Sequence, residues 1–179
     1  MSNNSITREE LAQGLTPDTD DIDSIMFFHG KESGPYGSKF VSLNREFTVD
    51  SPDFQGMDIW ERLETADNLT TGMKDLVVVG SSYGGLLAAL LYSRRPERFK
   101  GYVLLAPALY DAHDDAVSTI ERVPENAVVI HGTEDAIVPI ESVRKFCDRF
   151  GVEMVEVSDG HRLRDHHDIM LAKVREVNS

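Results

Sequence analysis

The residues of this chain best suited to chemistry are Ser82, Asp135 and His161. A serine hydroxyl becomes a nucleophile when a base takes its proton, and a histidine base needs a carboxylate that fixes its tautomer and orientation. Ser82 stands in the pattern Gly80-x-Ser82-x-Gly84, between an apolar run and a helix-forming run. Glycines at these positions permit a sharp strand-to-helix turn, because bulkier neighbours would collide with the serine. The pattern therefore predicts a nucleophile presented on such a turn.

Asp135 is the predicted acid. It lies in a short loop after the apolar run 127–130, which comes later in the chain than the run before Ser82. An acid that supports a serine nucleophile is commonly found in such a loop after a later strand. Glu134 is its closest rival, and Asp111, close to His113 in the sequence, offers a further acid. A turn-forming or helix-capping role is the alternative for Asp135.

His161 is the predicted base. It follows Gly160 in a loop after the run 152–157, whereas His166 and His167 lie in a helical pattern and compete with it less well. A metal site built from these three histidines and nearby aspartates is an alternative, but their spacing matches no recognised ligand motif. We therefore expect no metal.

The glycine-rich loop that begins at His29 predicts part of an oxyanion hole. It comes directly after the apolar run 25–28 and contains Gly30 and Lys31. The backbone N–H of Tyr83, next to the nucleophile, is the expected first donor to the oxyanion, and that of Lys31 is the expected second donor. His29 precedes the serine in the chain, so we expect it to shape the loop by hydrogen bonding.

Short apolar runs alternate with helical patterns along the rest of the chain. The four strongest runs predict buried strands of a parallel sheet: residues 25–28, 76–79, 102–106 and 127–130. A weaker run at 46–49 predicts another strand, and the half-polar run 152–157 predicts an edge strand. Cys147 falls on the apolar stripe of a predicted helix, so it belongs to the core. Strands alternating with helices predict a doubly wound α/β sheet covered by helices on both faces.

Composition sets the broad class. Of the 179 residues 41% are hydrophobic and 27% charged, which is typical of a soluble globular protein. We expect a flexible acidic lead-in at residues 1–23 and a single domain at 24–179. No apolar run approaches the ~20 residues that cross a bilayer. The lone cysteine and the lack of a secretory signal favour the cytoplasm.

The net charge argues against anionic partners. Eighteen basic and 31 acidic residues give a formal charge of −13. This charge repels nucleic-acid phosphates and anionic lipid surfaces unless a local basic patch exists, and we find no such patch in the sequence. We therefore expect neither nucleic acid nor a membrane as a partner, and the sequence gives no oligomeric state.

Taken together, these motifs resemble the α/β-hydrolase superfamily, and in particular its small, lidless bacterial esterase-like members. The resemblance covers residues 25 to about 161, and Ser33-Gly34-Pro35 approximates the end of their His-Gly-x-x-Ser-x-Pro loop. Lys31 departs from the large apolar residue that often follows His-Gly there. The resemblance implies a minimal fold without a cap domain, in which six strands remain in the order 2-1-3-4-5-6.

The resemblance also implies the activity. It points to a serine hydrolase that cleaves small carboxylic esters or thioesters through an acyl-enzyme and needs no cofactor. A non-catalytic binding protein that retains the fold is the alternative, and a peptidase or C–C bond hydrolase would use the same three residues. Residues 107–126 leave room for one crossover helix but not for a lid. An open site that prefers short acyl chains is therefore expected.

Overall fold

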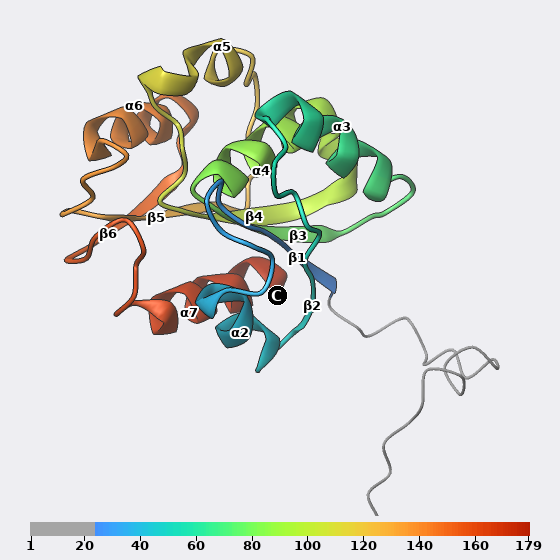
Figure 1. Ribbon diagram of the computed structural model, residues 1–179, viewed down its shortest axis with the longest axis horizontal. Helices are drawn as coiled ribbons and strands as arrows, with labels where there is room; N and C mark the ends of the chain where they lie inside the picture. Colours follow the sequence, from blue (N-terminus) through green and yellow to red (C-terminus); the bar gives the residue numbers. More distant parts are fainter. Residues whose placement is uncertain (1–23) are drawn as a thin grey trace, which may run out of the picture.

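A parallel sheet runs through the part of the chain that the computed structural model describes, residues 24–179 (Figure 1). The predicted lead-in at residues 1–23 lies outside these described residues. The strands are β1 (Ser24–Phe28), β2 (Thr48–Asp50), β3 (Leu76–Ser81), β4 (Phe99–Leu105), β5 (Ala127–Gly132) and β6 (Glu153–Val157). Their order is β2-β1-β3-β4-β5-β6, and all neighbouring pairs are parallel. The predicted strand order, and the edge position of the last strand, are confirmed.

Helices cover both faces of the sheet. They are α2 (Ser38–Asn44), α3 (Ile59–Leu69), α4 (Tyr83–Arg94), α5 (Asp114–Val117), α6 (Ile140–Phe150) and α7 (His167–Asn178). Figure 1 shows α3, α4, α5 and α6 on one face and α2 and α7 on the other. None of these helices combines the length and the apolar character that crossing a membrane requires.

The two-sided cover explains the uninterrupted apolar runs. On β3, Leu76 and Val78 belong to the core that contains α3, α4 and α6, whereas Val77 and Val79 belong to the core that contains α7. Both sides of the strand are thus removed from water, and no polar alternation is needed. Cys147 is buried as predicted, and burial raises the pKa of its thiol to about 12.

Ion pairs fix α3 relative to the end of α4. The Asp67 carboxylate accepts hydrogen bonds from Arg95 Nε at 2.9 Å and from Arg98 Nη1 at 2.8 Å. The bond from Arg95 in particular, and that from Arg98, hold the pKa of Asp67 below its usual value despite partial burial. At its other end α3 begins with a capping box between Asp58 and Glu61. Both ends of α3 are therefore anchored. This fixes the position of Arg62, which lies on α3 and contacts the candidate site.

Residues 107–126 contain less helix than the sequence predicts. The structure forms a 3₁₀ turn at Asp111–His113 and the four-residue α5, so the prediction of one crossover helix over most of the segment is wrong. The segment is rich in aspartate, serine and threonine, whose side chains compete for backbone hydrogen bonds and favour caps and turns. Within the described residues, no cap domain is built over the carboxyl end of the sheet.

Candidate active site

Ser82 lies on the turn between β3 and α4, in a backbone conformation that is unusual for a residue with a side chain. Its φ is 54° and its ψ is −113°, a conformation that costs about 1–3 kcal/mol and persists only when its surroundings enforce it. The Ser82 N–H donates to the Leu105 carbonyl at 2.9 Å, and the Ser82 carbonyl accepts from the Ala108 N–H at 2.9 Å. The neighbouring strand β4 and the loop after it therefore hold the turn in place.

Glycines allow this turn to pack against β1. A Cβ at Gly84 would overlap the carbonyl oxygen of Phe28, and a Cβ at Gly80 would lie 2.5 Å from the carbonyl oxygen of Gly84. Neither position can hold a larger residue without a backbone shift. The predicted Gly80-x-Ser82-x-Gly84 turn is thus present, and its glycines are required by close approach to backbone.

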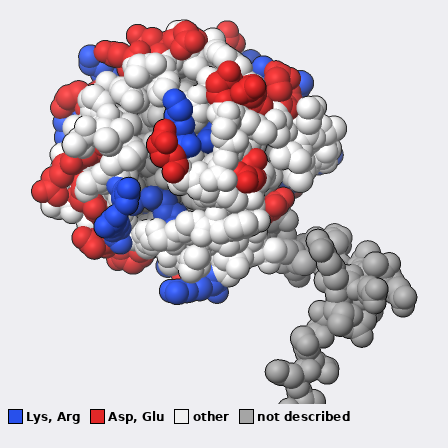
Figure 2. Space-filling model, viewed as in Figure 1, with Lys and Arg blue, Asp and Glu red and all other residues white. Residues whose placement is uncertain are grey.

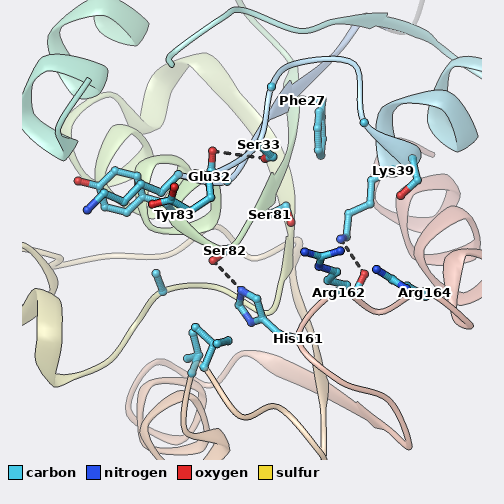
Figure 3. A pocket seen from close by; sticks show the side chains of 18 of the residues that line it. Phe27, Glu32, Ser33, Lys39, Ser81, Ser82, Tyr83, His161, Arg162 and Arg164 are labelled. Carbon is cyan, nitrogen blue, oxygen red and sulfur yellow. Dashed lines mark hydrogen bonds between the residues drawn. The ribbon is translucent and has the colours of Figure 1, made fainter. Parts of the chain in front are cut away.

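The side chains of Ser82, His161 and Asp135 form a continuous chain of hydrogen bonds. His161 Nε2 lies 3.0 Å from Ser82 Oγ, and His161 Nδ1 lies 2.7 Å from Asp135 Oδ2 (Figure 3 shows the bond to Ser82). With the proton on Nδ1 donated to the carboxylate, Nε2 is left to accept the serine proton. The three residues come from loops after β3, β5 and β6, whose carboxyl ends lie at one edge of the parallel sheet.

Asp135 is held as an ionised carboxylate with its oxygens in fixed directions. Its side chain is fully buried, and its Oδ1 accepts the backbone N–H groups of Ile137 and Val138, each at 2.8 Å. Burial raises the pKa of Asp135, but the hydrogen bonds from His161 and the two N–H groups outweigh it, so this pKa lies below its usual value. The buried His131 adds a ring nitrogen, Nε2, 3.3 Å from Oδ2.

The rival residues named from the sequence are placed elsewhere. Glu134 is exposed and Asp111 lies on the exposed 3₁₀ turn, and among the described residues neither bonds to His161. His166 Nδ1 is 2.8 Å from Asp159 Oδ2, and His167 Nδ1 is 2.8 Å from Ser42 Oγ. Within residues 24–179, no group of three or more His, Cys, Asp or Glu side chains is arranged to hold a metal ion.

A buried arginine, Arg62, organises the loop after β1 and was missed by the sequence analysis. Its guanidinium is fully buried and donates to the His29 carbonyl at 2.7 Å and to the Gly30 carbonyl at 3.1 Å. It also lies 4.8 Å from the centre of the Tyr83 ring. Arg62 falls on the apolar stripe of α3, three residues after Ile59, and a lone arginine on such a stripe is the signal that could have identified it.

His29 shapes the same loop, as predicted. Its Nδ1 donates to the Gly30 carbonyl at 2.7 Å, and its Nε2 accepts the Phe54 N–H at 2.8 Å. Burial lowers the pKa of His29, which fits a neutral ring with one donor and one acceptor nitrogen. The Gly30 carbonyl thus accepts from His29 and Arg62, and also from the Ser33 hydroxyl at a longer 3.4 Å.

This arrangement directs the N–H of Lys31. The peptide bonds of the described residues are all trans, so the Gly30 carbonyl and the Lys31 N–H point to opposite sides of the chain. The carbonyl faces Arg62, and the N–H therefore points away from it. Gly30 itself packs against the turn that carries Ser82, since a Cβ there would lie 3.7 Å from Ser82 Cβ. Tyr83 is the first residue of α4, so its N–H has no intrahelical partner.

A cavity of about 900 Å³ opens over Ser82 and His161. Its apolar wall comes from aliphatic and aromatic side chains that include Ala108, Tyr110, Ile137 and Val138. Residues 31–34 and 37–39 form another part of its wall. In Figure 3, Tyr83 and Glu32 lie on one side of the Ser82–His161 pair, and Lys39, Arg162 and Arg164 lie on the other. The hydroxyl is therefore accessible to a small molecule.

Comparison with known proteins places this geometry in context. A family model described as alpha/beta hydrolase fold matches residues 29–126. A structure assigned to the alpha/beta hydrolase superfamily, from Xanthomonas campestris pv. campestris, is 22% identical with a TM-score of 0.73, over 87% of this chain and 96% of that one. A search of curated proteins found no match.

Two further solved structures carry names of ester-related proteins. A monoacylglycerol lipase from Paleococcus ferrophilus is 17% identical with a TM-score of 0.66, over 87% of this chain and 93% of its own. Est1E from Butyrivibrio proteoclasticus is 17% identical with a TM-score of 0.70, over 87% of this chain and 86% of its own. At such identities the likeness shows the fold alone.

We predict that Asp135→Asn slows modification of the protein by a fluorophosphonate by about a hundredfold or more, because the amide cannot hold His161 in the tautomer that accepts the serine proton. Glu134→Gln is the matched control, since Glu134 is exposed on the same loop, and it should react within about twofold of the parent rate. The measurement is the rate of probe incorporation by intact mass. The reverse ranking would move the role of the acid to Glu134.

Proposed function

The chain belongs to the α/β-hydrolase family, and we propose that it is a serine hydrolase that cleaves small carboxylic esters or thioesters through an acyl-enzyme. Ser82 is the nucleophile, His161 the general base and acid, and Asp135 the carboxylate that orients the imidazole. The observation that carries the proposal is the unbroken hydrogen-bond chain from Asp135 through His161 to Ser82, at a hydroxyl open to a cavity. The chemistry needs no cofactor.

In the acylation half, Ser82 Oγ attacks the carbonyl carbon of the ester while His161 Nε2 takes its proton. The tetrahedral intermediate collapses, the bond to the alcohol or thiol breaks, and the leaving group receives the proton from His161. In the second half, water gives a proton to His161 and attacks the acyl carbon. The Ser82–acyl bond then breaks and Oγ recovers the proton, so the enzyme is regenerated.

Two backbone N–H groups are proposed to stabilise the oxyanion, those of Tyr83 and Lys31. The position of Tyr83 at the start of α4 supports the first, because the helix dipole favours negative charge there. The fixed orientation of the Gly30 carbonyl supports the second. Arg62 is a positioning residue for this loop, and its buried positive charge adds to the potential that favours an oxyanion.

Small ester or thioester substrates are proposed for this site on two grounds. Two of the structural neighbours are named a monoacylglycerol lipase and Est1E, and the latter is also seen with ferulic acid bound. The cavity is also uncovered by any cap domain within the described residues, so it lacks the long enclosing walls that bind an extended peptide or acyl chain.

The proposal is tested with 4-nitrophenyl butanoate and the corresponding thioester. We predict that Ser82→Ala abolishes hydrolysis of both while the melting temperature changes little, because the hydroxyl contributes no core volume.

His161→Ala should be as damaging as Ser82→Ala, since the two act as a unit and their losses do not add. His166→Ala is the control for a histidine outside the chain of bonds. Hydrolysis that survives in clean Ser82→Ala protein refutes the assignment, and well-folded parent protein with no turnover of any ester would favour a binding protein.

Replacing Arg62 tests the oxyanion loop. Methionine has a similar reach but cannot donate to the His29 and Gly30 carbonyls, so the loop should lose both of these hydrogen bonds. We predict that Arg62→Met lowers kcat for 4-nitrophenyl butanoate by about tenfold to a hundredfold with little change in KM, as for loss of an interaction made in the transition state. Thermal unfolding serves as the structural control. A loss of stability with an unchanged kcat in the folded protein would give Arg62 a purely structural role.

The small apolar wall predicts a preference for short acyl chains. Each buried methylene contributes about 0.8 kcal/mol only where an apolar surface receives it, and much of the remaining cavity wall is polar or charged. We predict that kcat/KM for 4-nitrophenyl esters is highest at about two to six carbons and declines for longer chains. The measurement is a chain-length series below the micelle concentration. A steady rise toward long chains would show that residues 31–39 form a lipid-binding wall.

A further inference from the structure

Three cationic side chains line one side of the candidate active-site cavity: Lys39, Arg162 and Arg164. Lys39 comes from α2 and the arginines from the loop directly after His161, so the fold assembles a basic wall from segments far apart in the sequence. The expectation that no basic patch exists is corrected by this finding. Figure 3 shows the three groups together beside Ser82 and His161.

The basic wall stands out against the charge of the whole protein. The chain carries a formal charge of −13, yet Glu32 is the one acidic residue lining this cavity, against the three basic residues of the wall and Lys31. On the face shown in Figure 2, acidic atoms dominate the rim, while basic atoms gather at the lower left, where α2 and the segment before α7 lie in Figure 1. A cavity whose sign opposes that of the protein attracts a ligand of the opposite charge.

These cations have no carboxylate partner within the described residues. None of the three forms an ion pair there, whereas Arg144 and Lys173 are each paired with two glutamates. The Lys39 Nζ donates to the Arg162 carbonyl at 2.8 Å. A backbone carbonyl carries no net charge, so the positive charges of the wall remain uncompensated in this part of the chain.

Besides burial, the excess of positive charge around Lys39 contributes to the lowered pKa of its ammonium group. Burial, and then the nearby Arg162 and Arg164, lower the pKa of Lys39 to about 8, and Asp159 opposes this only in part. The Asp159 carboxylate is already engaged by His166 Nδ1 at 2.8 Å and by the backbone N–H groups of Gly160 and Asp165. A bound anion would relieve the repulsion among the three cations, and the donor fork of a guanidinium group matches the two oxygens of a carboxylate.

We propose that Lys39, Arg162 and Arg164 form an anion subsite, and that the substrate is an ester or thioester carrying a carboxylate besides its scissile bond. This inference rests on the proposed function, because it extends the same cavity from bond cleavage to substrate choice. The carboxylate would lie against the basic wall while the scissile carbonyl lies at Ser82 Oγ. The uncharged wall at Ala108, Ile137 and Val138 would take the other end of the substrate.

The test compares substrates that differ in one carboxylate. On the acyl side the pair is mono-4-nitrophenyl glutarate and 4-nitrophenyl pentanoate, and on the leaving-group side it is 4-butanoyloxybenzoate and phenyl butanoate. We expect kcat/KM to favour the charged member of at least one pair by about tenfold at low salt, with the advantage shrinking as the salt concentration rises. Equal or lower values for the charged member in both pairs would overturn the subsite.

Matched variants locate the effect. Arg162→Gln/Arg164→Gln should remove most of this advantage, measured as the ratio of kcat/KM for the charged ester to that for the neutral ester of the same pair. Lys145→Gln/Arg149→Gln, which removes the same charge from exposed positions on α6, should leave the advantage intact. An equal loss in both double variants would show a general effect of net charge, and would overturn the subsite.

Two further readouts separate this inference from the proposed function. The ratio of charged to neutral kcat/KM should fall as the pH rises through about 8, where Lys39 loses its proton. The groups facing Lys39 are Arg162, Arg164, Asp159 and His167.

Calorimetric titration of the parent and Arg162→Gln/Arg164→Gln proteins with glutarate tests binding without turnover. Neutral esters cleaved with no charge preference and no glutarate binding would overturn the subsite alone, whereas no cleavage of any ester would overturn the proposed function.

Discussion

The backbone of Ser82 is the constraint on which the site depends. A residue with a side chain is held at a φ of 54° because its N–H and carbonyl bond to β4 and the loop after it, and because Gly84 lets α4 approach β1. That turn aims the hydroxyl at the edge of the sheet where β5 and β6 also end. Asp135 and His161 can then reach it from short loops, so the hydrogen-bonded turn at Ser82 decides where the three groups meet.

The buried charge beside this turn is the guanidinium of Arg62. Arg62 is fully buried without a carboxylate partner in the described part of the chain. Its Nη1 and Nη2 donate to the His29 and Gly30 carbonyls, whereas its Nε has no hydrogen-bond partner there. A buried guanidinium without a carboxylate partner lowers the stability of the fold, whereas a salt bridge would have neutralised its charge. The arrangement keeps a positive charge and an oriented peptide group beside Ser82. A charge and a peptide dipole that are already oriented need not reorient when negative charge develops on a bound molecule.

Much of the fold and the core of the site could be predicted because they depend on local patterns. Each buried strand is a continuous apolar run, and Ser82, Asp135 and His161 follow three of those strands in the chain order that the α/β-hydrolase resemblance implies. The preference for Asp135 over Glu134 rests on loop geometry, since only one of two adjacent side chains can point at the imidazole.

Other features depend on tertiary structure and left little trace in the sequence. The contact of Arg62 with the loop after β1 joins residues more than thirty apart in the chain. The basic wall joins Lys39 to Arg162, which are 123 residues apart. The segment 107–126 folded with only one turn of α-helix because its polar residues bond to their own backbone, an effect that length alone does not reveal.

The most direct measurement of the central claim is the position of a covalent adduct. The protein is treated with a fluorophosphonate, digested, and mapped by tandem mass spectrometry with fragments that separate Ser81 from Ser82. The account predicts one adduct per chain, on Ser82 Oγ, because only that hydroxyl lies 3.0 Å from His161 Nε2. An adduct on Ser81 or on another residue, or folded protein that remains unmodified, would contradict it.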